Sequence, residues 1–146
     1  MGLQDEVERV DQVDLLDDLA DPKRHEAEIQ QLFREGVLVA GFSPDLGLEP
    51  HNYRRYEACG KSLLLTRDEA GKFRAFENCC RHRGMELVSK DAPSGNKKLF
   101  VCPYHAWSYG TDGELMNVPF GDEGFANCDA VHVENRNLIE LPAMEK

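Results

Sequence analysis

The sequence lacks an apolar run long enough to cross a membrane. No stretch approaches the roughly 18 consecutive apolar residues that a membrane-spanning helix needs. The N-terminus also lacks a basic segment followed by an apolar one, so we expect no secretory leader and a cytoplasmic location. With 146 residues, 41% of them hydrophobic and 30% charged, the composition fits one soluble globular domain rather than a disordered chain.

Basic residues are scarce relative to acidic ones. Lys and Arg number 17 against 27 Asp and Glu, which gives a formal net charge of −10. A nucleic-acid-binding protein needs the opposite sign, so we expect neither nucleic acid nor a membrane among the partners. Ten of the acids lie in residues 1–28. A solvated helix face is the usual interpretation of such a stretch, and a docking surface for a basic redox partner is the alternative.

The cysteines do not suit a disulfide framework. There are five of them, an odd number, and no leader to send the chain to an oxidising compartment. In a reducing cytosol such cysteines are metal ligands or buried thiols. Their positions are Cys59, Cys79, Cys80, Cys102 and Cys128.

One helix is predicted from its end signals. Asp21 can cap it, Pro22 suits its first position and Gly36 a position just after its end, so the sequence predicts a helix over residues 22–35. The spacing of apolar residues over 3–20 is irregular, which is typical of a helix or of a disordered arm.

After Gly36 the chain consists of short segments rich in β-forming residues, separated by polar turns such as residues 93–96. The expected strands are residues 37–42, 52–57, 62–66, 73–77, 99–102, 107–109, 114–118 and 138–141. This pattern indicates a mainly β fold, an antiparallel sandwich or small barrel. The predicted organisation is an acidic N-terminal helical arm, residues 1–36, followed by one β domain, residues 37–146.

Two short segments each place a cysteine and a histidine close together: Cys80-x-His82 and Cys102-x-x-His105. Each follows an expected strand, so both can be loops at the same end of the β domain. A Cys₂His₂ set suits zinc, but zinc fingers usually keep the two cysteines in one unit and the two histidines in the other. Mixed units favour a two-iron two-sulfur cluster in which two histidines replace two cysteines on one iron. Zinc stays the alternative.

These segments resemble the Rieske signature of the large subunits of ring-hydroxylating and related Rieske-type oxygenases. As in that family, Arg83-Gly84 follows Cys80-x-His82, and Trp107 follows the second unit. The resemblance runs from about residue 28 to the end of the chain.

Other positions separate this chain from neighbouring families and from the usual oxygenase pattern. Respiratory and photosynthetic Rieske proteins carry an extra, disulfide-bonded cysteine in each loop, and those positions here hold Met85 and Tyr104. Ala106 stands where the oxygenase family mostly has Gly, and the segment between the loops is slightly long, with the surplus expected in the turn at 93–96. Surface turns accept added residues at little cost, so we still expect the cluster.

The resemblance implies a Rieske-type antiparallel β sandwich whose two loops hold a 2Fe-2S cluster. Cys80 and Cys102 would hold the inner iron as thiolates, and His82 and His105 would hold the iron nearer to solvent. The Tyr104 hydroxyl and the loop amides are candidate donors of hydrogen bonds to the cluster.

Some of the remaining candidate residues could act at the cluster or in the core, and the others are expected to have structural roles only. Trp107 either covers the cluster or belongs to the core. Cys79 is expected to be a buried free thiol. Without the disulfide and with an acidic surround, we expect a reduction potential towards the low end of the Rieske range of about −150 to +300 mV. Structural roles are expected for Cys59, Cys128, His25, His51 and His132.

The implied function is electron transfer from a reductase or ferredoxin to an oxygenase catalytic domain or subunit. In the family a second domain holds a mononuclear iron through two histidines and a carboxylate. The chain has five histidines in all, and they leave no suitable closely spaced pair. We therefore expect this Fe(II) to lie in a missing domain or in a partner, and we expect no catalytic residue in this chain. The chain would be an oxidoreductase component of monooxygenase or dioxygenase type. A stand-alone Rieske ferredoxin-like carrier and a zinc-stabilised non-redox module are the alternatives.

Overall fold

The computed structural model describes residues 20–120 and 136–146. The chain divides into two compact units, Met1–Val39 and Ala40–Lys146. Within the described ranges no helix is both long and apolar enough to span a bilayer. The predicted domain boundary between residues 36 and 37 stays a prediction. Cys128, His132 and all but the last residue of the segment 3–20, for which the sequence also made predictions, lie outside the described residues.

The first unit contains the predicted helix. It begins as α2 (Pro22–Glu28) and continues without a break as the π-helix η1 (Ile29–Arg34). The Asp21 side chain accepts a hydrogen bond of 3.0 Å from the backbone N–H of Lys23, so it is the N-cap that the sequence predicts. No residue of α2 is buried.

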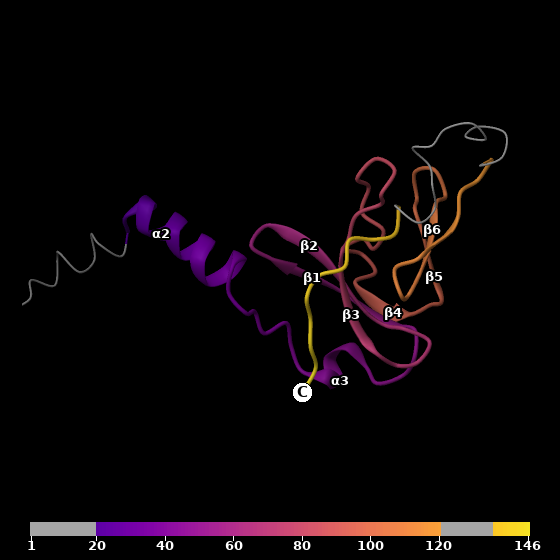
Figure 1. The fold of residues 1–146 in the computed structure, drawn as a ribbon, viewed down its shortest axis with the longest axis horizontal. Coiled ribbons are helices and arrows are strands. Elements are labelled where there is room, and N and C mark those ends of the chain that lie inside the picture. Colours follow the sequence, from indigo (N-terminus) through magenta and orange to yellow (C-terminus); the bar gives the residue numbers. More distant parts are fainter. Residues whose placement is uncertain (1–19, 121–135) are drawn as a thin grey trace, which may run out of the picture. The chain divides into compact units, whose positions relative to one another are not determined.

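A four-stranded antiparallel sheet in the order β3-β2-β1-β4 opens the second unit (Figure 1). Its strands are β1 (Asn52–Ala58), β2 (Lys61–Arg67), β3 (Phe73–Glu77) and β4 (Ser94–Asn96). The first three confirm predicted strands. The predicted turn at 93–96 is wrong, because residues 94–96 pair with residues 52–54 and so give backbone partners to one side of β1.

A second antiparallel sheet has the order β5-β6-β7. Its strands are β5 (Leu99–Val101), β6 (Ser108–Gly110) and β7 (Leu115–Asn117). All three overlap predicted strands. The middle one begins at Ser108 rather than at Trp107, because the Trp107 carbonyl closes the preceding turn by accepting the Cys102 N–H at 2.8 Å.

Two other predicted strands take different forms. Residues 37–42 are not a strand: they lead irregularly into α3 (Ser43–Leu46), and Val37 is 97% exposed. Residues 138–141 form an isolated bridge, Phe76↔Glu140, against the outer side of β3. We call residues 136–146 the C-terminal segment; it is the yellow chain in Figure 1.

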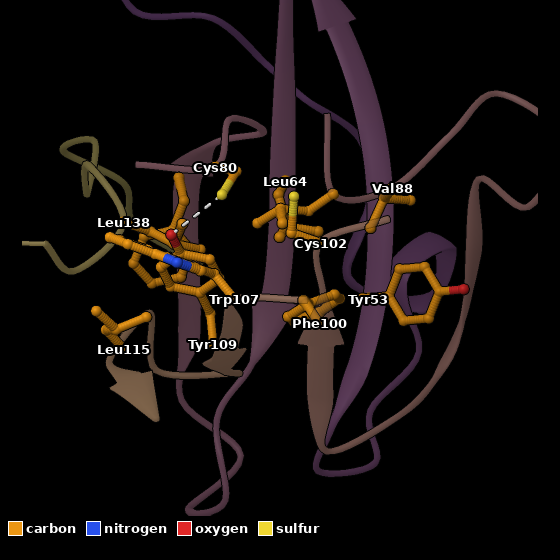
Figure 2. Close-up of a cluster of buried hydrophobic side chains, with 12 residues drawn as sticks. Tyr53, Leu64, Cys80, Val88, Phe100, Cys102, Trp107, Tyr109, Leu115 and Leu138 are labelled. Carbon is orange, nitrogen blue, oxygen red and sulfur yellow. Dashed lines mark hydrogen bonds between the residues drawn. The ribbon is translucent and has the colours of Figure 1, made fainter. Parts of the chain in front are cut away.

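The core lies where the two sheets face each other (Figure 2). The first sheet contributes Tyr53, Leu64 and Phe76, and the second contributes Phe100, Tyr109 and Leu115. Strand alternation explains these choices, since paired residues such as Phe100 and Tyr109 share one face. The thiols of Cys80 and Cys102 belong to the same buried cluster, so the two motif segments start from the core.

Candidate metal centre

The first motif segment forms a tight turn over residues 80–85, which we call the first turn. The Cys80 N–H donates to the Met85 carbonyl at 2.8 Å, and the Gly84 N–H donates to the Cys80 carbonyl at 2.9 Å. Gly84 has φ 75°, a conformation that glycine adopts without steric cost. His82 lies between these two hydrogen bonds, and the chain reverses direction at the end of β3.

The second motif segment repeats this backbone pattern over residues 102–107, which we call the second turn. The Cys102 N–H donates to the Trp107 carbonyl at 2.8 Å, and the Ala106 N–H donates to the Cys102 carbonyl at 3.0 Å. Ala106 occupies the position equivalent to Gly84 and has φ 57°. The second turn joins β5 directly to β6, and on either side of it Val101 of β5 pairs with Ser108 of β6.

The two turns bring the two predicted cysteine ligands together in the core. Cys80 is 1% exposed and Cys102 is 3% exposed. Burial raises the pKa of the Cys80 thiol, and the neighbouring Cys102 thiol adds to the increase, while a hydrogen bond with Tyr109 opposes it. Both are free thiols, as are the other described cysteines. A group that stabilises thiolates, such as a metal centre, fits this pair.

The two predicted histidine ligands also lie together. The ring centroids of His82 and His105 are 4.6 Å apart, and both side chains are half-buried. His82 stacks on Trp107 with ring centroids 4.9 Å apart and planes 8° from parallel. Burial lowers the pKa of His82, and the charges of His105 and Arg83 act in the same direction. The two rings are therefore held close together, and the lowered pKa of His82 favours its neutral imidazole, the form that binds metals.

The donor set fits a two-iron cluster. The Nδ1 atom of His82 is buried and has no hydrogen-bond partner among the described residues, so a metal ion would satisfy it. No group of three or more His, Cys, Asp or Glu side chains in those ranges converges as a single-ion site. Two thiols and two imidazoles match a centre in which each iron takes two protein ligands.

Comparison with known proteins assigns the family. The Rieske [2Fe-2S] domain model matches residues 37–134, which is more than half of the chain. The chain belongs to the Rieske [2Fe-2S] domain family. Domains of this family carry a 2Fe-2S cluster and transfer electrons, and this chain matches the N-terminal Rieske domain of ring-hydroxylating oxygenase α subunits.

Similar proteins include both dioxygenases and a monooxygenase. The large oxygenase component of the 2,4-dinitrotoluene dioxygenase system from Burkholderia sp. (strain RASC) is 42% identical over 96 residues, which cover 66% of this chain and 20% of that protein. Chloroplastic choline monooxygenase from Amaranthus tricolor is 40% identical over 96 residues, covering 66% of this chain and 21% of that protein. The chain therefore spans about a fifth of the length of these curated relatives.

A solved structure confirms the predicted fold class. The structure of naphthalene 1,2-dioxygenase with indole bound in its active site superposes on this chain with a TM-score of 0.76 and 31% sequence identity. The superposition covers 87% of this chain and 27% of that one. The two antiparallel sheets thus form the Rieske fold of oxygenase α subunits.

A tyrosine that the sequence analysis did not single out lies beside the Cys80 thiol. The Tyr109 hydroxyl lies 3.4 Å from Cys80 Sγ (Figure 2). It also accepts the Arg81 backbone N–H at 3.0 Å. Burial raises the pKa of Tyr109, so the hydroxyl stays protonated. The predicted candidate, Tyr104, is instead 54% exposed and places its ring on His105, with centroids 3.7 Å apart. Alternation in β6, which directs Tyr109 inward with its neighbour Phe100, is the signal that would have found it.

The structure also shows where the other residues singled out in the sequence lie. Trp107 belongs to the core, where it is 3% exposed, and it also stacks on His82; its role in covering the cluster stays a prediction. Cys79 is half-buried rather than buried. Cys59 lies at the tip of the β1–β2 hairpin, where it and Gly60 have φ 51° and 72°, as in a type I′ turn. His51 contacts Thr111 Oγ1 at 3.2 Å, and His25 lies on α2.

Proposed function

We propose that this Rieske domain holds its 2Fe-2S cluster through Cys80, Cys102, His82 and His105. The cluster would take single electrons from a reductase or ferredoxin and pass them to a mononuclear iron oxygenase site outside these 146 residues. The observation that carries the proposal is the pairing itself: two buried thiols at the edge of the core and two half-exposed imidazoles beside each other, presented by two matching turns.

The bound cluster would supply reversible one-electron redox chemistry, and the chain's own residues would set its surroundings. The buried thiols keep water from the sulfur side. The Tyr109 hydroxyl offers a hydrogen bond to Cys80 Sγ, which stabilises negative charge on that sulfur. The Trp107 ring covers one face of His82 and fixes its orientation. The half-exposed histidine rings leave a route for an electron towards a docked partner.

The oxygenase role in this proposal is supported by the similar proteins. The two curated relatives are an oxygenase component and a monooxygenase, and each is about five times as long as the matched region. We therefore propose the reaction class, oxygenation fed by one-electron steps, and leave the substrate open.

The test replaces His82 or His105 by Ala, with His25→Ala on α2 as the matched control. Anaerobically purified wild-type protein should contain two irons and two sulfides per chain and give a Rieske electron paramagnetic resonance signal on reduction. Each ligand variant should lose or change that signal, whereas the control keeps it. A redox titration should place the midpoint in the lower part of the range of about −150 to +300 mV. Colourless protein with stoichiometric zinc, or an unchanged signal in both ligand variants, would overturn the assignment.

A further inference from the structure

A buried asparagine lies at the base of the loop that contains the first turn. Asn78 is the last residue before Cys79 and Cys80, and it is only 2% exposed. A buried carboxamide has two donor and two acceptor positions, and each one left without a partner costs stability. The position of the Asn78 carboxamide is therefore determined by what surrounds it.

Four hydrogen bonds to described residues satisfy the Asn78 side chain. Its Nδ2 donates to the Val88 carbonyl at 2.8 Å and to the Ser62 hydroxyl at 3.0 Å. Its Oδ1 accepts the backbone N–H groups of Leu87 at 3.2 Å and Val88 at 3.0 Å. Its own backbone N–H donates to the Ser62 carbonyl at 3.0 Å. One side chain thus joins both ends of residues 78–88, the first loop, and ties them to β2.

The first loop needs such a fastening because no β ladder closes it. The second turn is closed by the paired strands β5 and β6 on either side of it. The first loop leaves β3 at Glu77 and reaches Val88 without a paired strand. The backbone bonds of the first turn, from Cys80 to Met85, hold that turn together but do not connect it to the sheet.

We infer that Asn78 is a positioning residue for the metal centre: by closing the first loop on β2, it fixes Cys80 and His82 relative to the ligands of the second turn. This inference rests on the proposed ligand set. Asn78 itself touches none of the four ligands in its recorded side-chain bonds, so its effect passes through the loop backbone.

The decisive variant is Asn78→Asp, which keeps the size and both acceptors but loses the two donors and sets a carboxylate against the Val88 carbonyl. Its matched control is Asn96→Asp, an exposed carboxamide on β4 that bonds the Pro50 carbonyl and Asn52. We expect Asn78→Asp to release iron to a chelator at least about tenfold faster than wild type, because buried donor–acceptor pairs are lost. Asn96→Asp should release it at the wild-type rate.

Two further measurements separate positioning from general loss of stability. Hydrogen exchange of the holoprotein should accelerate at the Leu87 and Val88 amides in Asn78→Asp and stay unchanged in β5 and β6. Leu65→Ala, a buried change on β2, should not release iron as fast as Asn78→Asp when urea brings wild type and both variants to equal stability. If Asn78→Asp does not fold, Ser62→Ala decides, because it removes only one of the four bonds and should accelerate release severalfold compared with Ser94→Ala.

The inference is overturned if iron release and amide exchange in the Asn78→Asp protein, or in Ser62→Ala, match those of their controls. It is also overturned if Leu65→Ala at equal stability releases iron as quickly. The proposed function fails separately, through the absence of a Rieske signal in wild-type protein. In that case the exchange of the Leu87 and Val88 amides still tests the closure of the first loop.

Discussion

The first and second turns have the same backbone and different supports. In each, the N–H of the cysteine bonds the carbonyl five residues later, and the N–H four residues later bonds the carbonyl of the cysteine. The histidine is offset by one position, since it follows Cys80 by two residues and Cys102 by three. The shared pattern explains how two segments far apart in sequence each present one proposed pair of ligands from the same backbone geometry.

The supports differ because the flanking structure differs. The second turn is a hairpin connection between paired strands, so local sequence and the β5–β6 ladder suffice to hold it. The first turn lies in a longer loop that is held by buried side chains, Asn78 at its base and Tyr109 at its Arg81 amide. The first turn is held by distant side chains and the second by its neighbouring strands, so the two turns should respond unequally to equivalent mutations.

The largest difference in the cost of a mutation to stability is expected at the last position of each turn. Trp107 is 3% exposed and Met85 is 41% exposed, although both supply the equivalent carbonyl. We expect Trp107→Ala to lower the free energy of unfolding by about 3–5 kcal/mol, the usual cost of removing a buried large aromatic side chain. Met85→Ala should cost under ~1 kcal/mol because a large part of the Met85 side chain is already in water.

Anaerobic urea unfolding followed by circular dichroism measures both values. Trp107→Phe serves as the conservative control, since it keeps an aromatic ring beside His82 and should recover part of the loss. Equal costs for Trp107→Ala and Met85→Ala would show that the two turns are supported alike.

The next difference is expected at the fourth residue after each cysteine, where Gly84 and Ala106 both have positive φ. An alanine in this region is strained by about 1–2 kcal/mol, partly offset by the greater unfolded-state entropy of glycine. We therefore expect Ala106→Gly to stabilise the domain by ~0.5–1 kcal/mol and Gly84→Ala to destabilise it by a similar amount. A Cβ on Gly84 would meet only Cys79 Sγ, at 3.9 Å, so no clash adds to this cost.

Thermal unfolding of Ala106→Gly, of Gly84→Ala and of the double variant measures these opposite changes in stability. The double variant should have nearly the wild-type midpoint, with single shifts of about 3 °C in opposite directions. A loss of stability in Ala106→Gly would mean that the alanine side chain contributes packing that outweighs its backbone strain.

The parts of this molecule that local sequence determines were predicted well. The capping signals at Asp21 and Pro22 predicted the start of α2, and segments rich in β-forming residues predicted β1, β2 and β3. The Cys-x-His and Cys-x-x-His segments predicted two loops, and the structure has a turn at each. These features depend on residues within one turn or strand of each other.

The features that the sequence did not predict depend on contacts between distant residues. Residues 94–96 form β4 only because β1 offers an unpaired edge. Residues 37–42 have β-forming side chains but no β partner among the described residues, so their propensity is not realised. Tyr109 reaches Cys80 across 29 positions of sequence, and the residues that Asn78 joins span two loop ends and a strand. Pattern and spacing carry no information about such pairings.

The smallest effect on stability is expected beside the first sheet, where the C-terminal segment lies along β3. Within the described residues no such segment lies along β5, the edge strand of the second sheet. Arg67, a buried residue of β2, binds both carboxylate oxygens of Glu145, at 2.9 and 2.5 Å. The Arg67 guanidinium lowers the pKa of Glu145 from 4.5 to about 2. Because the folded-state pKa is lowered, the pair stabilises the fold fully above pH 4.5, and its contribution is lost as the pH falls towards about 2.

We therefore expect Glu145→Gln to lower stability by about 1 kcal/mol or less at pH 7, since solvent screens a carboxylate that is one-third exposed. The difference from wild type should shrink steadily below pH 4.5 and vanish only as the pH falls through about 2, whereas Glu69→Gln, an exposed change on the β2–β3 turn, serves as the control and should differ little from wild type. Urea unfolding at several pH values measures it. A difference that persists at low pH would mean that Glu145 contributes through packing, and that the ion pair is not what holds the C-terminal segment beside the strand that leads into the first turn.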